Sequence, residues 1–177
     1  MTDDRSRSIY LPPWRLDIVG RPGVRSPLPD AAIARSAAVA LDATQASAPG
    51  SITIVLTDDA ELAELNQEHL GHEGPTDVLS FPMLSPAVFG RGRGDDRRAP
   101  MPTQGRRTHI GDIAISIERA TEQAEQGRGG QTGDVRWSVA DELRLLVTHG
   151  VLHLCGWDHA EPDEEAEMRA MEQKLLR

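Results

Sequence analysis

The segment from His149 to His159 limits most strongly how this chain can fold and act. His149 and His153 are four residues apart, so a helix would present both side chains on one face. Gly156 can end that helix in a left-handed turn, after which the chain can bring His159 back toward the other two histidines. Three imidazoles with an open fourth position are typical of catalytic zinc. We therefore expect these three histidines to hold one zinc ion per chain.

The spacing is that of the helix-borne zinc motif H-E-x-x-H-x-x-G-x-x-H, with one departure. Gly150 stands where the proteases of that group carry their general-base glutamate. The sequence thus keeps a metal cage and lacks the proteolytic base. The alternatives are a structural zinc or histidines satisfied within the core. A structural zinc usually has four protein ligands, and the nearest further candidates are Asp158 and Cys155.

The composition indicates a soluble, cytoplasmic protein. The 177 residues suffice for one domain with a sizeable core, and the single cysteine excludes an internal disulfide. No apolar run reaches membrane-spanning length, and the first residues lack the layout of a secretory signal.

The net charge of -9 argues against wholesale coating of nucleic acid, because phosphate binding depends on clustered Lys and Arg. Arginines are nevertheless concentrated in one stretch rich in Gly, Pro and Asp. They are Arg91, Arg93, Arg97, Arg98, Arg106 and Arg107. A local basic patch and a solvated insertion both fit this composition. We expect a long flexible loop at about residues 84–108.

The remaining patterns predict an α/β (α+β) fold. Strand patterns occupy residues 15–19, 51–56, 78–81 and 113–117. Helix starts are indicated at Asp30, Asp58, Glu118, Ser138 and Pro162. We expect residues 1–177 to form one domain, with a small mixed sheet of about four strands and about five helices. The helix that carries the first two histidines is apolar nearly all round, so it should lie in the core.

A second group of polar residues precedes a buried strand. A turn led by Pro75 brings Thr76 and Asp77 to the head of the strand that starts at Val78. Many turn-to-strand junctions look like this, and turn formation alone would explain the pair. Thr76 and Asp77 are candidate substrate-binding residues, whereas the other histidines, His69, His72 and His109, are expected at the surface.

Taken together, these segments resemble the YbeY family of bacterial rRNA maturation factors, which are metal-dependent endoribonucleases. The matching segments recur in family order from about residue 51 to the end. They are Leu65-Asn66, Pro75 to Pro82, Gly111 to Ile113, His149 to His159 and the helix from Met168 to Leu176. The resemblance implies a single-domain α/β fold and a zinc ion held by the three histidines. It also implies cleavage of single-stranded RNA in 3′-end maturation of small-subunit rRNA and in ribosome quality control, with that rRNA and ribosomal proteins as partners.

One position departs from the family pattern. Members commonly carry an arginine a few residues after the Leu-Asn pair, thought to serve the phosphate, and Leu70 stands there in this chain. Arg106, Arg107 and Arg144 are candidates to supply the missing charge.

The absence of a glutamate at Gly150 is compatible with hydrolysis, since a zinc-bound water has a pKa of roughly 7 and needs no strong protein base. Two other functions remain open. One is a zinc hydrolase of peptides or amides, for which the sequence offers no base. The other is a non-catalytic ribosome-assembly factor with a structural zinc.

Overall fold

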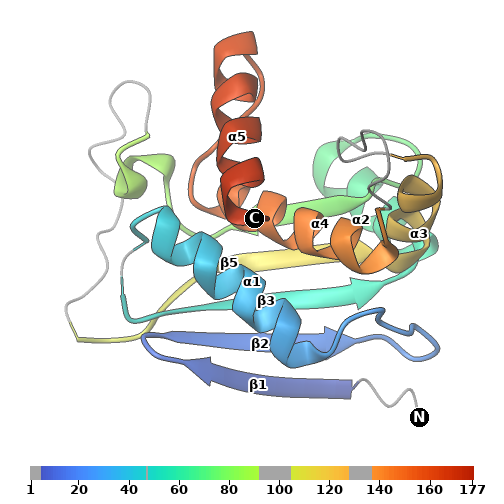
Figure 1. The fold of residues 1–177 in the computed structure, drawn as a ribbon, viewed down its shortest axis with the longest axis horizontal. Coiled ribbons are helices and arrows are strands. Elements are labelled where there is room, and N and C mark those ends of the chain that lie inside the picture. Colours follow the sequence, from blue (N-terminus) through green and yellow to red (C-terminus); the bar gives the residue numbers. More distant parts are fainter. Residues whose placement is uncertain (1–4, 47, 92–104, 128–136) are drawn as a thin grey trace.

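A mixed five-stranded sheet forms the middle layer of the molecule, with the strand order β1-β2-β3-β5-β4 (Figure 1). This computed structural model describes residues 5–46, 48–91, 105–127 and 137–177. Neighbouring strands are antiparallel at both edges and parallel in the centre. The strands are β1 (Arg5–Leu11), β2 (Trp14–Gly20), β3 (Gly50–Thr57), β4 (Val78–Pro82) and β5 (Thr108–Ser116).

Helices cover both faces of this sheet. Within the described ranges they are α1 (Asp30–Ala43), α2 (Asp59–Leu70), α3 (Ile117–Glu125), α4 (Val139–Leu154) and α5 (Pro162–Leu175), with a short 3-10 helix η1 (Pro86–Phe89). Helices α1 and α4 lie across one face, and α5 packs on α4 and projects away from the sheet (Figure 1). Helix α2 packs against β4 and β5. The chain folds as a single α+β domain, as its sequence predicts.

Successive side chains of a strand point to opposite faces of the sheet, which explains why a hydrophobic cluster and helices lie on each face. On β5, Ile113 and Ile115 are fully buried in the larger core cluster, which also contains most of the buried face of α4. The intervening Ala114 belongs to a smaller cluster under α2, together with Leu62 and Leu79. Each buried leucine or isoleucine stabilises the fold by about 1.5–3 kcal/mol relative to an exposed side chain. The prediction that α4 lies in the core is therefore confirmed.

Local sequence also fixes several helix starts. The Asp58 side chain accepts a 2.9 Å hydrogen bond from the backbone N–H of Glu61, and Ser138 and Asp141 form a reciprocal capping box on α4. Helix α1 begins at Asp30, as expected, but the Asp30 side chain does not cap it. Pro29 holds the extended N-cap position, and the Asp30 carboxylate pairs with Arg5 at 2.8 Å instead.

The predicted sheet of four strands was one strand short, because β1 was missed. The segment Arg-Ser-Arg-Ser-Ile-Tyr-Leu is largely exposed at the edge of the sheet and pairs only with β2, so it carries no apolar alternation. Ile117, expected in the last strand, is instead the first residue of α3, because the Ser116 side chain caps that helix. The expected loop at residues 84–108 contains η1, and its residues 92–104 lie outside the described part of the chain.

The described helices include none long and apolar enough to cross a membrane.

Candidate metal centre

The three histidines of the sequence motif come together at the end of α4. One ring nitrogen from each of His149, His153 and His159 lies within 4.8 Å of the others. The Nε2 atoms of His149 and His153 are 3.0 Å apart. The ring of His159 stacks on that of His149 with a centroid separation of 5.6 Å. The structure thus brings together all the residues that the sequence proposes as metal ligands.

A tight turn after α4 returns His159 to the helix. Gly156 has a φ of +81°, a conformation that favours glycine, and its backbone N–H donates to the carbonyl of His153 at 3.0 Å. The next residue, Trp157, donates its backbone N–H to the carbonyl of Leu152, also at 3.0 Å. The prediction that Gly156 ends the helix and redirects the chain is confirmed.

Two of the three rings are oriented by hydrogen bonds on the nitrogen that faces away from the cluster. His149 Nδ1 lies 2.6 Å from Glu172 Oε1, and His153 Nδ1 lies 2.9 Å from the carbonyl oxygen of Trp157. Since carboxylate and carbonyl oxygens only accept, both Nδ1 atoms carry the hydrogen. When both rings are neutral, the two Nε2 atoms at the centre of the cluster therefore present lone pairs.

This arrangement of lone pairs fits a metal ion. Two acceptor nitrogens 3.0 Å apart repel each other unless a cation lies between them. Tetrahedral zinc with bonds of about 2.0–2.1 Å would separate its ligand nitrogens by about 3.3 Å, close to the observed distance. Burial, followed by repulsion from His149 and His159, lowers the pKa of His153 to about 4, so this ring is neutral at pH 7. Neutral imidazole is the form that binds metal.

Gly150 lies between the first two histidines and faces the sheet. A Cβ atom at this position would be 2.8 Å from Cγ2 of Ile113, a fully buried residue of β5. The carbonyl oxygen of Gly150 accepts a 3.1 Å hydrogen bond from Ser80 Oγ of β4. Helix α4 therefore approaches the sheet too closely at this point for any side chain larger than hydrogen.

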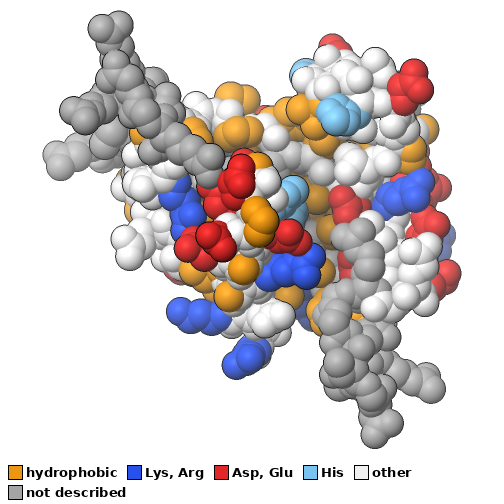
Figure 2. Space-filling view, turned by 90° about the horizontal axis from the view of Figure 1, so that it is seen from above, with side chains coloured by type: hydrophobic (Ala, Val, Ile, Leu, Met, Phe, Trp, Pro, Cys, Tyr) orange, Lys and Arg blue, Asp and Glu red, His pale blue; other side chains and the backbone are white. Residues whose placement is uncertain are grey.

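The histidines open onto a cleft of about 860 Å³ between α4, β4 and the loop after α2, which we call the main cleft. A smaller hollow of about 250 Å³, the side cavity, adjoins His149 and His159 on the α5 side. Asp77 lines both spaces, and Thr76 and Leu70 line the main cleft. Figure 2 looks onto this side of the molecule, where histidine surface lies among acidic and hydrophobic side chains.

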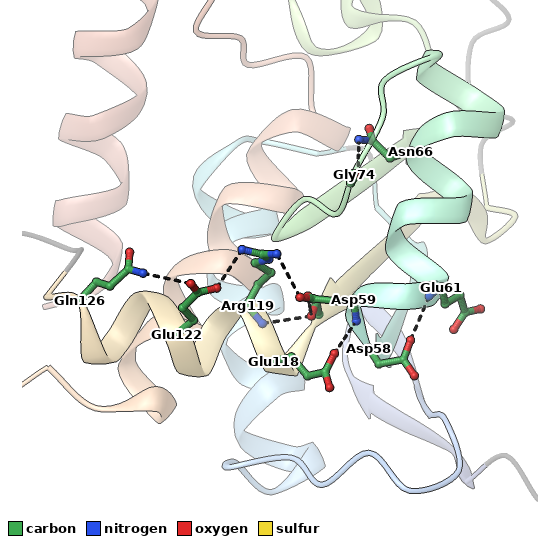
Figure 3. A network of polar contacts seen from close by, with 10 residues as sticks. Asp58, Asp59, Glu61, Asn66, Gly74, Glu118, Arg119, Glu122 and Gln126 are labelled. Atoms are coloured by element: carbon green, nitrogen blue, oxygen red, sulfur yellow. Dashed lines mark hydrogen bonds and ion pairs between the residues drawn. The ribbon is translucent and has the colours of Figure 1, made fainter.

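The loop that carries Thr76 and Asp77 is held in place by α2. The side chain of Asn66 donates to the carbonyl oxygen of Gly74 at 2.9 Å, as Figure 3 shows. The Asp77 carboxylate accepts from the backbone N–H of Val78 at 2.9 Å and from the Thr76 hydroxyl at 3.3 Å. The two candidate substrate-binding residues thus lie beside the histidine cluster.

The candidate arginines lie elsewhere on the molecule. The Arg107 guanidinium donates to the carbonyls of Pro13 and Gly50 at 2.9 Å, which ties it to the β1–β2 turn and the start of β3. Arg144 pairs with Asp141 at 3.0 Å and lines a separate cavity between α1 and α4.

Arg106 is exposed on the segment that leads into β5 and does not line the main cleft. Arg91 is linked to that cleft through Trp157. Its Cζ lies 3.3 Å from the ring centroid of Trp157, and Trp157 lines the main cleft with the histidines. Arg91 also adjoins Asp158 and Glu164 in a small polar hollow. Arg93, Arg97 and Arg98 fall outside the described residues.

Two polar contacts of the site could not be read from the motifs. Glu172 reaches His149 from α5, and Gln123 of α3 donates to Asp77 Oδ2 at 3.0 Å. A signal existed for Glu172, because it follows Met168 by one helical interval and Met168 is buried against the core. Sequence offered no comparable signal for Gln123. The remaining histidines, His69, His72 and His109, are exposed, as predicted.

An α+β domain in which a buried helix and the turn after it present three histidines to an open cleft defines a candidate metal-dependent hydrolase. Comparison with known proteins agrees with this class. The family model described as Endoribonuclease YbeY matches residues 29–177. The chain belongs to this YbeY family of endoribonucleases.

Individual relatives have the same family name. An endoribonuclease YbeY of Thermobifida fusca is 37% identical over 164 residues, which cover 91% of each chain. Another from Salinispora tropica is 41% identical over 137 residues, covering 77% of this chain and 79% of the relative. The solution structure of a Thermotoga maritima protein matches 82% of this chain and 77% of its own, with a TM-score of 0.50 and 23% identity. This last likeness concerns the fold alone.

Proposed function

We propose that this chain is a zinc-dependent endoribonuclease that cleaves single-stranded RNA. The observation that carries the proposal is the cluster of three imidazoles, with ligand nitrogens within 4.8 Å of one another, at the floor of a cleft of about 860 Å³. A space of this size is within the range that accommodates small-molecule groups such as a nucleotide. Membership of an endoribonuclease family supports RNA as the substrate.

Zinc is the proposed metal, because neutral imidazole nitrogens suit this borderline-soft cation and three protein ligands are characteristic of its catalytic sites. His149, His153 and His159 would hold it. A zinc ion bound there would supply Lewis-acid polarisation of a phosphoryl oxygen and a water of lowered pKa.

The residues around the cluster would bind and orient the RNA. Thr76 and Asp77 line the main cleft and offer a hydroxyl and a carboxylate to the hydroxyl groups of substrate or water. For the phosphate we propose Arg91, whose guanidinium is held on the Trp157 ring at the edge of the cleft. It would replace the arginine that the family commonly has at the position of Leu70.

We further propose that the chain acts in the cytoplasm as one domain of residues 1–177. There it would take part in 3′-end maturation of small-subunit rRNA and in ribosome quality control, in contact with ribosomal proteins. Family membership supports this setting, and the accessible cleft is compatible with a single strand of RNA.

Cleavage assays with purified zinc-loaded protein test the proposal. Unstructured RNA should be cut, structured RNA and casein should not, and His149→Ala should abolish cutting. Casein cleavage lost in His149→Ala would instead establish a peptide hydrolase. Absence of any turnover, with co-sedimentation on small ribosomal subunits, would establish a non-catalytic assembly factor with a structural metal.

A further inference from the structure

The Asp77 carboxylate is held through both of its oxygens. Oδ1 accepts from the backbone N–H of Val78 at 2.9 Å and from the Thr76 hydroxyl at 3.3 Å. Oδ2 accepts from the side-chain amide of Gln123 at 3.0 Å. The first two donors are its sequence neighbours, whereas Gln123 comes from α3, so this amide connects the carboxylate to a separate part of the fold.

The surroundings of Gln123 indicate that its role is the hydrogen bond to Asp77. Its side chain is only 9% exposed, and its Oε1 atom is buried without a hydrogen-bond partner among the described residues. Burying an amide with one unsatisfied atom costs stability. An apolar side chain would fill the same space without that cost, so packing alone does not explain a glutamine here.

Helix α3 is fixed rigidly enough to position a neighbouring group. Arg119 of α3 pairs with Asp59 of α2 at 3.2 Å and with Glu122 at 2.8 Å (Figure 3). Ser116 Oγ, at the start of α3, also donates to Asp59 at 2.6 Å. The same helix α2 holds the loop before Asp77 through Asn66. Helix α2 therefore anchors both partners: it holds Gln123 through α3, and it holds Asp77 through the loop that precedes it.

We propose that Gln123 is a positioning residue that holds the Asp77 carboxylate toward the side cavity, where His149 and His159 also lie. In this orientation Asp77 accepts a hydrogen bond from the water that attacks the RNA phosphate and orients that water. A carboxylate free to rotate would lose this alignment, and misplacement by a fraction of an ångström lowers a rate without weakening substrate binding. This inference rests on the proposed endoribonuclease function.

Gln123→Ala tests the inference, and Gln126→Ala is its matched control. Gln126 is a glutamine on the same helix, but its amide donates to Glu122 and does not reach the site. We expect Gln123→Ala to lower kcat about tenfold with KM for RNA and zinc content unchanged, as removal of groups that orient catalytic residues does. Gln126→Ala should match the wild type. Equal kcat in all three proteins would overturn the inference.

Two further measurements separate positioning from a structural role. In metal-free protein, the shifts in urea midpoint caused by Gln123→Ala and Asp77→Ala should be non-additive when combined. Additive shifts would mean that the contact does not act as a unit. Gln123→Glu should be nearly inactive at pH 8 and recover relative to wild type toward pH 6, since a protonated glutamate regains the donor. A constant ratio of activities across this range would contradict the proposal.

Failure of this inference can be distinguished from failure of the proposed function. If wild-type protein does not cut RNA, the proposed function fails. If wild-type protein cuts RNA and Gln123→Ala cuts equally well, only the role of Gln123 is refuted.

Discussion

The Glu172 carboxylate lies 2.6 Å from His149 Nδ1 and connects α5 to the histidine cluster on α4. Glu172 is mostly buried, with 13% of its side chain exposed. The hydrogen bond places the His149 proton on Nδ1 and leaves Nε2 free to bind metal. The last helix of the chain thus contributes to the site although it supplies none of the three histidines.

Substitution of Glu172 should therefore weaken metal binding. Carboxylates that orient ligating histidines typically contribute 10–100-fold in metal affinity, and we expect a loss of roughly this size for Glu172→Gln. Competition with a zinc chelator measures the affinity, and Glu167→Gln, at an exposed position on the same helix, is the control. Equal affinities for the two variants would contradict a role for Glu172.

Removal of one ligand should abolish both the metal and its contribution to stability. Protein purified without added metal should contain about one divalent ion per chain, and His153→Ala should contain almost none. Since a ligand that binds only the folded state stabilises it, EDTA should lower the Tm of the wild type and leave that of His153→Ala unchanged. Equal metal content by elemental analysis in the two proteins would refute the assignment of the site.

Arg91→Ala should weaken RNA binding in a salt-dependent manner. Loss of one phosphate contact is expected to reduce the slope of log affinity against log salt by about one. Arg107→Ala is a suitable control, because the guanidinium of Arg107 is engaged by the carbonyls of Pro13 and Gly50. An unchanged slope in Arg91→Ala would place the phosphate contact elsewhere.

Leu70→Arg should restore binding and cleavage when Arg91 is absent. Leu70 is 58% exposed and lines the main cleft, so a longer cationic side chain has room there. We expect the double variant to recover most of the activity that Arg91→Ala loses. If both arginines bind the same phosphate, the double variant should also recover the wild-type slope of log affinity for RNA against log salt.

The ion pair between Arg21 and Glu61 of α2 gives a prediction about stability in acid. The hydrogen bond from Arg21 lowers the pKa of Glu61 below 4.5, with further help from Thr57. A carboxylate whose folded pKa is depressed stabilises the protein above its unfolded pKa, and this contribution is lost as the pH falls through the folded pKa. Both partners are partly exposed, so we expect Arg21→Met to cost only about 0.5 kcal/mol at pH 7.

The cost of Arg21→Met should shrink as the pH is lowered below 4.5. Urea unfolding of metal-free protein at several pH values measures this cost, since metal binding then makes no contribution and the histidines titrate equally in wild type and variant. Arg169→Met removes a more exposed pair with Glu165 and controls for the loss of one positive charge. A cost that stays constant with pH would contradict the conclusion that Arg21 lowers the pKa of Glu61.

Features encoded within one helix or turn could be predicted from sequence. The His149–His153 interval, the Gly156 turn and the Ser138–Asp141 capping box depend on neighbours within a few residues. Strand β1 could not be predicted, because a polar edge strand is defined by backbone pairing with β2 and not by its side chains.

The contacts around the histidines depend on packing between distant segments. Gln123 reaches Asp77 across 46 residues of sequence, and Glu172 reaches His149 across 23. Gln123 has no local signal that distinguishes it from other polar residues on amphipathic helices. The four-residue interval from Met168 to Glu172 indicates a side chain near the buried face of the helix, but it does not identify His149 as the partner. The same limit applies to Arg107, whose guanidinium is directed toward the β1–β2 turn by contacts that only the folded chain creates.

The close contact of Gly150 with Ile113 bears on how this chain is related to the zinc proteases that share its histidine spacing. In the helix-borne protease motif, the residue after the first histidine must project into the site to act as a base. In this fold the same position is pressed against the central sheet. Glutamate at position 150 would disrupt the core before it could contact a substrate. The shared histidine spacing is therefore no evidence of a one-step evolutionary route between this family and the zinc proteases.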